Sequence, residues 1–124
     1  MKASLSPDFT KLREEMVDNA IFARGVRSEL VLDAMRSVPR ESFLPAQLHE
    51  FAYDDAPLPI EEGQTISQPY IVAFMTEALV LRGGENVLEI GTGSGYAAAV
   101  LSEIAGNVYT VERHGPLAER AAAA

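Results

Sequence analysis

The sequence NVLEIGTGSG at residues 86–95 decides the fold of this chain. Its first five residues form a short apolar run typical of a buried strand, and three glycines at every second position follow directly. Residues 96–105 have the composition of a helix, and Gly106 is placed to end it. A strand that enters a helix through a glycine turn is the beginning of a βαβ unit.

The segments on either side extend this unit. Val108–Val111 is a second apolar strand, and another helix begins near Pro116. Upstream, Pro69 marks the start of a helix over residues 70–81. Two consecutive strands joined by a helix run parallel. We therefore expect an α/β fold whose parallel sheet carries helices on both faces.

Two short helices are predicted before residue 39. Ser6 and Pro7 favour the start of the first, and Ser28 can cap the second, which Pro39 ends. The residues between 39 and 69 are rich in proline and predict an extended surface segment with one helical turn at residues 46–50. The second helix carries Leu30, Val31, Ala34 and Met35 on one face, and Met16, Met35 and Met75 are assigned to the core.

The composition narrows the class of protein. The chain has 124 residues, a formal net charge of −8 and no cysteine. This charge argues against nucleic acid and anionic membranes as partners, because both would be repelled. Neither His49 nor His114 has a second ligand at metal-site spacing, so we expect surface histidines and no metal. No secretory signal or membrane span is visible, and we expect a cytoplasmic protein.

The glycine turn predicts a ligand site. Glycines 91, 93 and 95 tolerate positive φ and let a ligand approach the backbone at a helix N-terminus. Glu112 follows the second strand, where a carboxylate can accept hydrogen bonds from a ribose diol. Glu89 would be repelled by a pyrophosphate but would suit the amino group of a methionine moiety. The spacing of the glycines also differs from the dinucleotide pattern, so S-adenosylmethionine is favoured over NAD. The alternative, a tight turn with no ligand and a solvated Glu112, is disfavoured by this placement.

The segment before the helix at Pro69 has two interpretations. Ser67 is a good N-cap residue for that helix, and Thr65 could be a plain turn residue. Both side chains could instead face a site, because a capping hydroxyl can still contact a ligand. The residues alone leave both interpretations open.

Several segments together resemble the protein-L-isoaspartate O-methyltransferase family. The most specific is GQTISQPYIVA at residues 63–73, and VLEIGTGSGY at residues 87–96 matches the family's cofactor motif. The other similar segments are Met16-Val17, Arg24–Val26, Val31–Pro45, Ala52–Asp55 and Pro57–Ile60, so that the resemblance covers roughly residues 11–120.

The resemblance implies methylation of the stray carboxylate of L-isoaspartyl and D-aspartyl residues in damaged proteins, with S-adenosylmethionine as methyl donor and no metal. Ser67 is the implied catalytic residue. The substrate carboxylate, with a reference pKa near ~4, is already an anion at neutral pH and needs no general base. The implied cofactor-binding residues are Gly63, Gln64, Thr65, Glu89, Gly91, Thr92, Gly93, Gly95 and Glu112.

A complete fold of this kind has about seven strands, and two are predicted here. We expect one partial domain over residues 1–124: a helical and extended cap at 1–60 and the start of a Rossmann-like core at 61–124. This N-terminal half of a class I methyltransferase fold looks truncated. We expect it to be inactive without its missing C-terminal half, to expose an apolar patch, and to self-associate or remain partly disordered. The alternatives are a non-catalytic interaction fragment and another S-adenosylmethionine-dependent methyltransferase.

Overall fold

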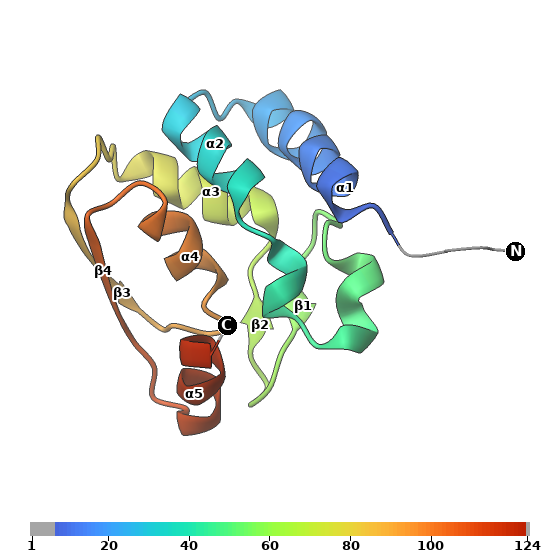
Figure 1. The fold of residues 1–124 in the computed structure, drawn as a ribbon, viewed down its shortest axis with the longest axis vertical. Coiled ribbons are helices and arrows are strands. Elements are labelled where there is room, and N and C mark those ends of the chain that lie inside the picture. Colours follow the sequence, from blue (N-terminus) through green and yellow to red (C-terminus); the bar gives the residue numbers. More distant parts are fainter. Residues whose placement is uncertain (1–6, 124) are drawn as a thin grey trace, which may run out of the picture.

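The computed structural model describes residues 7–123, which form an α/β fold (Figure 1). The helices are α1 (Phe9–Met16), α2 (Glu29–Ser37), α3 (Pro69–Ala78), α4 (Tyr96–Ser102) and α5 (Gly115–Ala123). The strands are β1 (Leu58–Pro59), β2 (Thr65–Ile66), β3 (Asn86–Ile90) and β4 (Asn107–Val111). Short helical turns of other types lie at Val17–Ile21, Phe22–Arg24, Arg40–Phe43 and Ala46–Phe51, the last at the predicted position.

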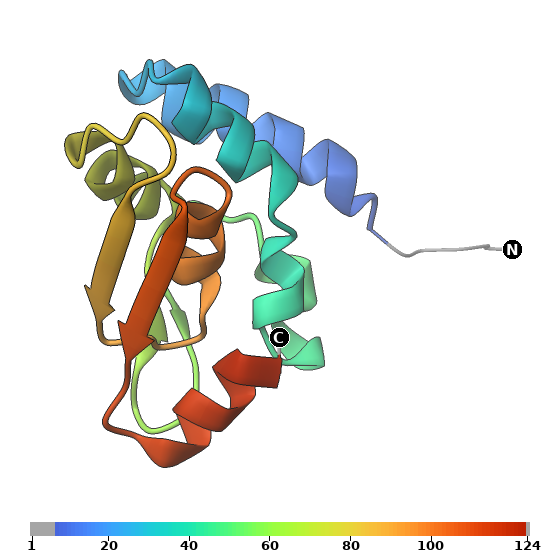
Figure 2. The same ribbon diagram turned by 60° about the vertical axis from the view of Figure 1, so that its left-hand side comes forward.

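β3 and β4 form the predicted parallel pair. Their register runs from Asn86 opposite Asn107 to Ile90 opposite Val111. Figure 2 shows the two strands side by side, with α4 behind them. Because both strands run in the same direction, their carboxyl ends meet at one edge of the sheet, and the glycine turn begins there.

Local capping chemistry sets the ends of the helices. The Ser28 hydroxyl accepts a hydrogen bond from the Val31 amide at 3.4 Å, as predicted for the cap of α2. α1 is capped by Asp8, whereas the start predicted at Ser6 lies outside the described residues. α3 begins at Pro69 as predicted, because proline suits the first helical position.

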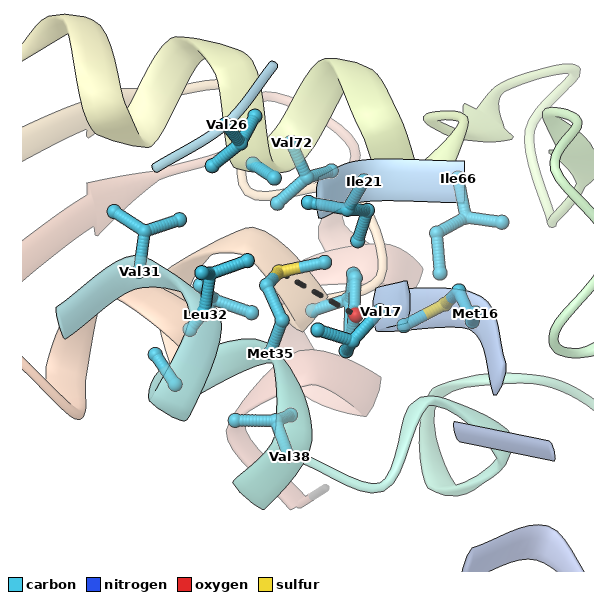
Figure 3. Packing of buried hydrophobic residues seen from close by; sticks show 14 of the residues in the cluster. Met16, Val17, Ile21, Val26, Val31, Leu32, Met35, Val38, Ile66 and Val72 are labelled. Carbon is cyan, nitrogen blue, oxygen red and sulfur yellow. Dashed lines mark hydrogen bonds between the residues drawn. The ribbon is translucent and has the colours of Figure 1, made fainter. Parts of the chain in front are cut away.

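The N-terminal helices and the Rossmann-like segment share one buried core, part of which is shown in Figure 3. Met35 of α2 lies within it, and the Tyr96 hydroxyl of α4 donates a hydrogen bond to its sulfur at 4.0 Å, drawn as the dashed line. Met16 is also buried, so these two core predictions are confirmed. The N-terminal helices are therefore packed as part of the same fold as the glycine turn.

One core prediction is wrong. Met75 on α3 is 63% exposed, and Leu30, on the predicted apolar face of α2, is 44% exposed. Apolar periodicity identifies a helix face, but burial also requires a neighbouring element, and no described segment covers these two side chains.

An antiparallel hairpin was not predicted within the proline-rich segment. Leu58 pairs with Ile66, and Pro59 pairs with Thr65. Ile66 is buried in the core and anchors the hairpin, while Thr65 before it is exposed. The hairpin thus carries the predicted site segment toward the edge of the β3–β4 sheet.

One face of the β3–β4 sheet is exposed and apolar. Leu88, Ile90, Tyr109 and Val111 are between 50% and 77% exposed. The apolar side chains of these strands suit burial on both faces, but α4 covers one face and the other is exposed. The expected apolar patch is confirmed.

Candidate functional site

The glycine turn leaves an open space beside Gly91 at the carboxyl end of β3, which we call the cradle. Gly91 has a φ of 90°, which favours glycine, and a β-carbon there would meet no atom within 4 Å. At Gly95, with a φ of 91°, a β-carbon would instead lie 3.1 Å from Cβ of Ala121 in α5. Gly91 therefore leaves space for a ligand, whereas Gly95 allows close packing of α5.

Hydrogen bonds to the end of β4 hold the turn in place. The Gly91 and Thr92 amides donate to the carbonyl of Val111 at 2.8 and 3.0 Å. The Gly93 amide donates to Oε1 of Glu112 at 2.8 Å. The turn is therefore fixed before any ligand binds.

A cavity of about 500 Å³ brings the hairpin and the turn together. Gln64 and Thr65 form one wall of the cavity, and Gly91, Gly93 and Glu112 form another. These five predicted residues, separated by almost fifty positions in the chain, thus meet at one place. Ile90, Val111, Arg113 and His114 complete the lining. Gly63, Ser67, Glu89, Thr92 and Gly95 do not line it.

Glu112 is held by backbone amides. In addition to the bond from Gly93, its Oε2 accepts a hydrogen bond from the His114 amide at 3.0 Å. The amide of Gly93 and then that of His114 lower the pKa of Glu112, so it is an anion at neutral pH. A carboxylate has about four acceptor positions, and Glu112 therefore retains capacity for a ligand diol.

Glu89 is half-buried beside a residue that sequence analysis missed. The Thr110 hydroxyl donates to Oε1 of Glu89 at 2.7 Å and lies 2.6 Å from the hydroxyl of Thr92. Burial raises the pKa of Glu89, and the charge of Glu112 raises it further, against the effect of Thr110. Thr110 pairs with Glu89 in the sheet register, so an in-register parallel alignment of the two strands would have indicated it.

Ser67 follows β2 and is exposed. Its hydroxyl makes no hydrogen bond with residues 7–123, and the residue that caps α3 is Gln68, without a side-chain bond. The capping interpretation of Ser67 is therefore wrong in this structure. The carbonyl of Ser67 accepts a hydrogen bond from Nη2 of Arg40 at 3.0 Å.

The histidines differ from the surface assignment. His49 is half-buried, with Nε2 3.0 Å from the carbonyl of Leu44. His114 lines the cavity, and its buried Nε2 has no partner within the described part of the chain. Among residues 7–123, no group of three acidic or histidine side chains could hold a metal ion. In the same range, no helix has the length and apolar character needed to cross a membrane.

The βαβ unit, its glycine turn and the acidic residue after β4 define a Rossmann-like class I methyltransferase fold, of which this chain forms the N-terminal half. Residues 11–124 match the model of the protein-L-isoaspartate(D-aspartate) O-methyltransferase family, and the chain belongs to that family.

Relatives and solved structures agree with this assignment. Protein-L-isoaspartate O-methyltransferase 1 of Rhodopseudomonas palustris strain HaA2 is 68% identical over 94% of this chain and 47% of its own length. The Methylorubrum extorquens PA1 protein-L-isoaspartate O-methyltransferase is 57% identical over 94% of the chain and 51% of its own length. A solved protein-L-isoaspartate O-methyltransferase superimposes with a TM-score of 0.79 at 34% identity, over 90% of this chain and 37% of that one.

A Plasmodium falciparum structure solved with S-adenosyl-L-homocysteine gives a TM-score of 0.76 at 26% identity, over 90% of this chain and 53% of that one. This chain spans about half the length of the curated relatives that it matches.

Proposed function

We propose that this chain provides the cofactor-binding portion and the active-site serine of a carboxyl O-methyltransferase. Its substrates would be L-isoaspartyl and D-aspartyl residues of damaged proteins. The observation that supports this function is the cavity where Gln64 and Thr65, just before Ser67, face the glycine turn. Family membership supports the same substrate class.

The site fits S-adenosylmethionine. The open space at Gly91 suits a ligand that approaches the backbone closely, because no side chain stands in its way. Glu112 would accept hydrogen bonds from the ribose, and the turn with Gln64 and Thr65 would enclose the cofactor. Gly63, Glu89, Thr92 and Gly95 would support these groups from outside the cavity lining. When bound, S-adenosylmethionine supplies an electrophilic methyl group on a sulfonium sulfur.

The residues of this chain would act mainly by position. The isoaspartyl carboxylate is an anion at neutral pH and therefore attacks without a general base. The Ser67 hydroxyl would donate a hydrogen bond to one carboxylate oxygen and so orient the other. In the transfer, a bond forms between carboxylate oxygen and methyl carbon while the bond from that carbon to sulfur breaks. Alignment of the two reactants would supply most of the acceleration.

The proposal also covers the domain organisation of the chain, its cellular location and its partners. Residues 1–60 would form a helical and extended cap of the domain, and residues 61–124 would form the start of the Rossmann-like core. Damaged proteins in the cytoplasm would be the partners, without nucleic acid, membrane or metal.

Methyl transfer to matched peptides tests this function. Two peptides of one sequence, with isoaspartate or normal aspartate at one position, are incubated with labelled S-adenosylmethionine. The assay uses the 124-residue chain and, in a second arm, the chain joined to the C-terminal half of the Rhodopseudomonas palustris relative. We expect label in the isoaspartyl peptide in the second arm. Equal labelling of both peptides would indicate another methyltransferase, and no labelling in either arm would contradict the proposal.

A further inference from the structure

Arg40 is fully buried at the start of the Arg40–Phe43 turn. Within residues 7–123 no carboxylate lies within ion-pair distance of its guanidinium, and its buried Nη1 has no hydrogen-bond partner. A buried charge without an ion pair stabilises a fold poorly. Packing alone therefore gives no reason for an arginine at this position.

The contacts of Arg40 connect three segments around the candidate site. Its Nη2 donates to the carbonyl of Ser67 at 3.0 Å, and its Nε donates to the carbonyl of Ala52 at 2.6 Å. The centre of the guanidinium lies 4.9 Å from the centroid of the Tyr96 ring. Tyr96 is the first residue of α4 and directly follows the glycine turn. One side chain thus touches both the Ser67 segment and the helix that starts at the cofactor side.

We propose that Arg40 is the positioning residue for Ser67, holding its backbone relative to the glycine turn so that the hydroxyl can meet the substrate carboxylate. This inference rests on the proposed function and assigns Arg40 no contact with substrate.

The backbone of Ser67 needs such support. Ser67 lies between the two-residue strand β2 and Gln68, the cap of α3. Its hydroxyl has no hydrogen bond within the described residues to fix its position. The position of the hydroxyl is therefore set by the backbone, whose carbonyl is held by Arg40. A misplacement of about 1 Å in a reacting group can reduce a rate about a hundredfold.

Arg40 is itself held by a network from the N-terminal part of the chain. Its amide donates to the hydroxyl of Tyr53 at 3.0 Å, and Nε of Arg13 donates to the same hydroxyl at 2.8 Å. Tyr53 in turn donates to Glu41, which pairs with Arg13. Burial lowers the pKa of Arg40, while its interaction with the hydroxyl group of Tyr96 opposes this change. This network fixes the position of Arg40, and so of the Ser67 carbonyl that Arg40 contacts.

The experiment compares Arg40→Met and Arg40→Lys with the control Arg36→Met. Arg36 is partly exposed and forms surface ion pairs, including one of 3.4 Å with Glu14, so its loss changes an arginine without touching Ser67. Two readouts are taken: the ¹³C shift of the Ser67 carbonyl in the 124-residue chain, and kcat, KM and S-adenosylhomocysteine affinity in whichever form transfers methyl groups.

We expect Arg40→Met to shift the Ser67 carbonyl signal and to reduce kcat about a hundredfold, with cofactor affinity changed less than about twofold. Lysine lacks the planar fork of arginine and should restore only part of the rate, to about a tenfold loss. Arg36→Met should match the wild type in both readouts. A merely structural role would lower thermal stability and cofactor affinity along with kcat.

An Arg40→Lys protein with an unchanged Ser67 carbonyl shift and wild-type kcat would overturn the inference, as would losses in kcat that follow stability alone. The Arg40→Lys comparison can still be made if Arg40→Met does not fold. If the wild type transfers no methyl group, the proposed function fails, and the Ser67 carbonyl shift still decides whether Arg40 holds that backbone.

Discussion

Replacing Gly91 by alanine should separate the conformation of the turn from its role as a ligand cradle. At a φ of 90°, an alanine lies outside the regions that residues with a side chain prefer, at a cost of about 1–3 kcal/mol. No steric term is added, because the new methyl group would meet no atom within 4 Å. For a chain of this size, that cost corresponds to a fall in melting temperature of roughly 4–12 °C.

Gly84→Ala provides the matched control. Gly84 has a φ of 86°, a β-carbon there also meets nothing within 4 Å, and the residue does not line the cavity. The two variants should therefore lose similar stability in thermal melts of the 124-residue chain. They should differ in S-adenosylhomocysteine affinity, because only the Gly91→Ala methyl group would enter the space of the ligand.

Calorimetric titration with S-adenosylhomocysteine, in a form of the protein that binds it, is the assay for this difference. We expect at least a tenfold loss for Gly91→Ala, about 1.4 kcal/mol, and wild-type affinity for Gly84→Ala. Equal affinities in the two variants would refute the assignment of the cradle at Gly91, even if both proteins were destabilised as expected.

Three other predictions concern Ser67, the carboxylate of Glu89 and the exposed face of the β3–β4 sheet. Ser67→Ala should reduce kcat on an isoaspartyl peptide more than it reduces S-adenosylhomocysteine affinity or thermal stability. Steady-state kinetics and thermal melts test this, and an equal fall in stability would indicate a structural role for the hydroxyl instead. Because the folded pKa of Glu89 is raised, folding favours its protonated form, and stability should decline as pH rises from the ordinary value of 4.5 toward the raised one. Thermal melts between pH 4 and 7 should show the stability of the wild type falling relative to that of Glu89→Gln as pH rises; parallel curves would contradict it. The 124-residue chain should self-associate through its exposed face, where Ile90 is 77% exposed, so Ile90→Glu should lower the average mass in sedimentation. A monomeric wild type would contradict this prediction.

The predictions that held depended on local chemistry. The bounds of β3 followed from an apolar run that ends at a glycine turn, and both depend on neighbouring residues only. Ser28 as a cap and Pro69 as the first residue of α3 were predicted for the same reason, because a cap acts within one helical turn. The candidate site residues, which stay predictions, were indicated by the turn, by the acid after β4 and by the resemblance of the Gln64–Ser67 segment.

The errors came from contacts between distant segments. The β1–β2 hairpin has two residues in each strand, one of them a proline, and such short strands carry no period-2 pattern. Met75 lies on an apolar face, but the sequence could not show that no described element covers that face.

By itself, the sequence determined the βαβ unit, its glycine turn and the residue types suited to a ribose and a carboxylate, because these depend on local conformation and side-chain chemistry. Only the tertiary structure placed the hairpin opposite the glycine turn, Thr110 beside Glu89 and Arg40 against the Ser67 carbonyl. Each of these contacts joins residues far apart in the chain. Their distances are set by the packing of the shared core, which no local pattern encodes.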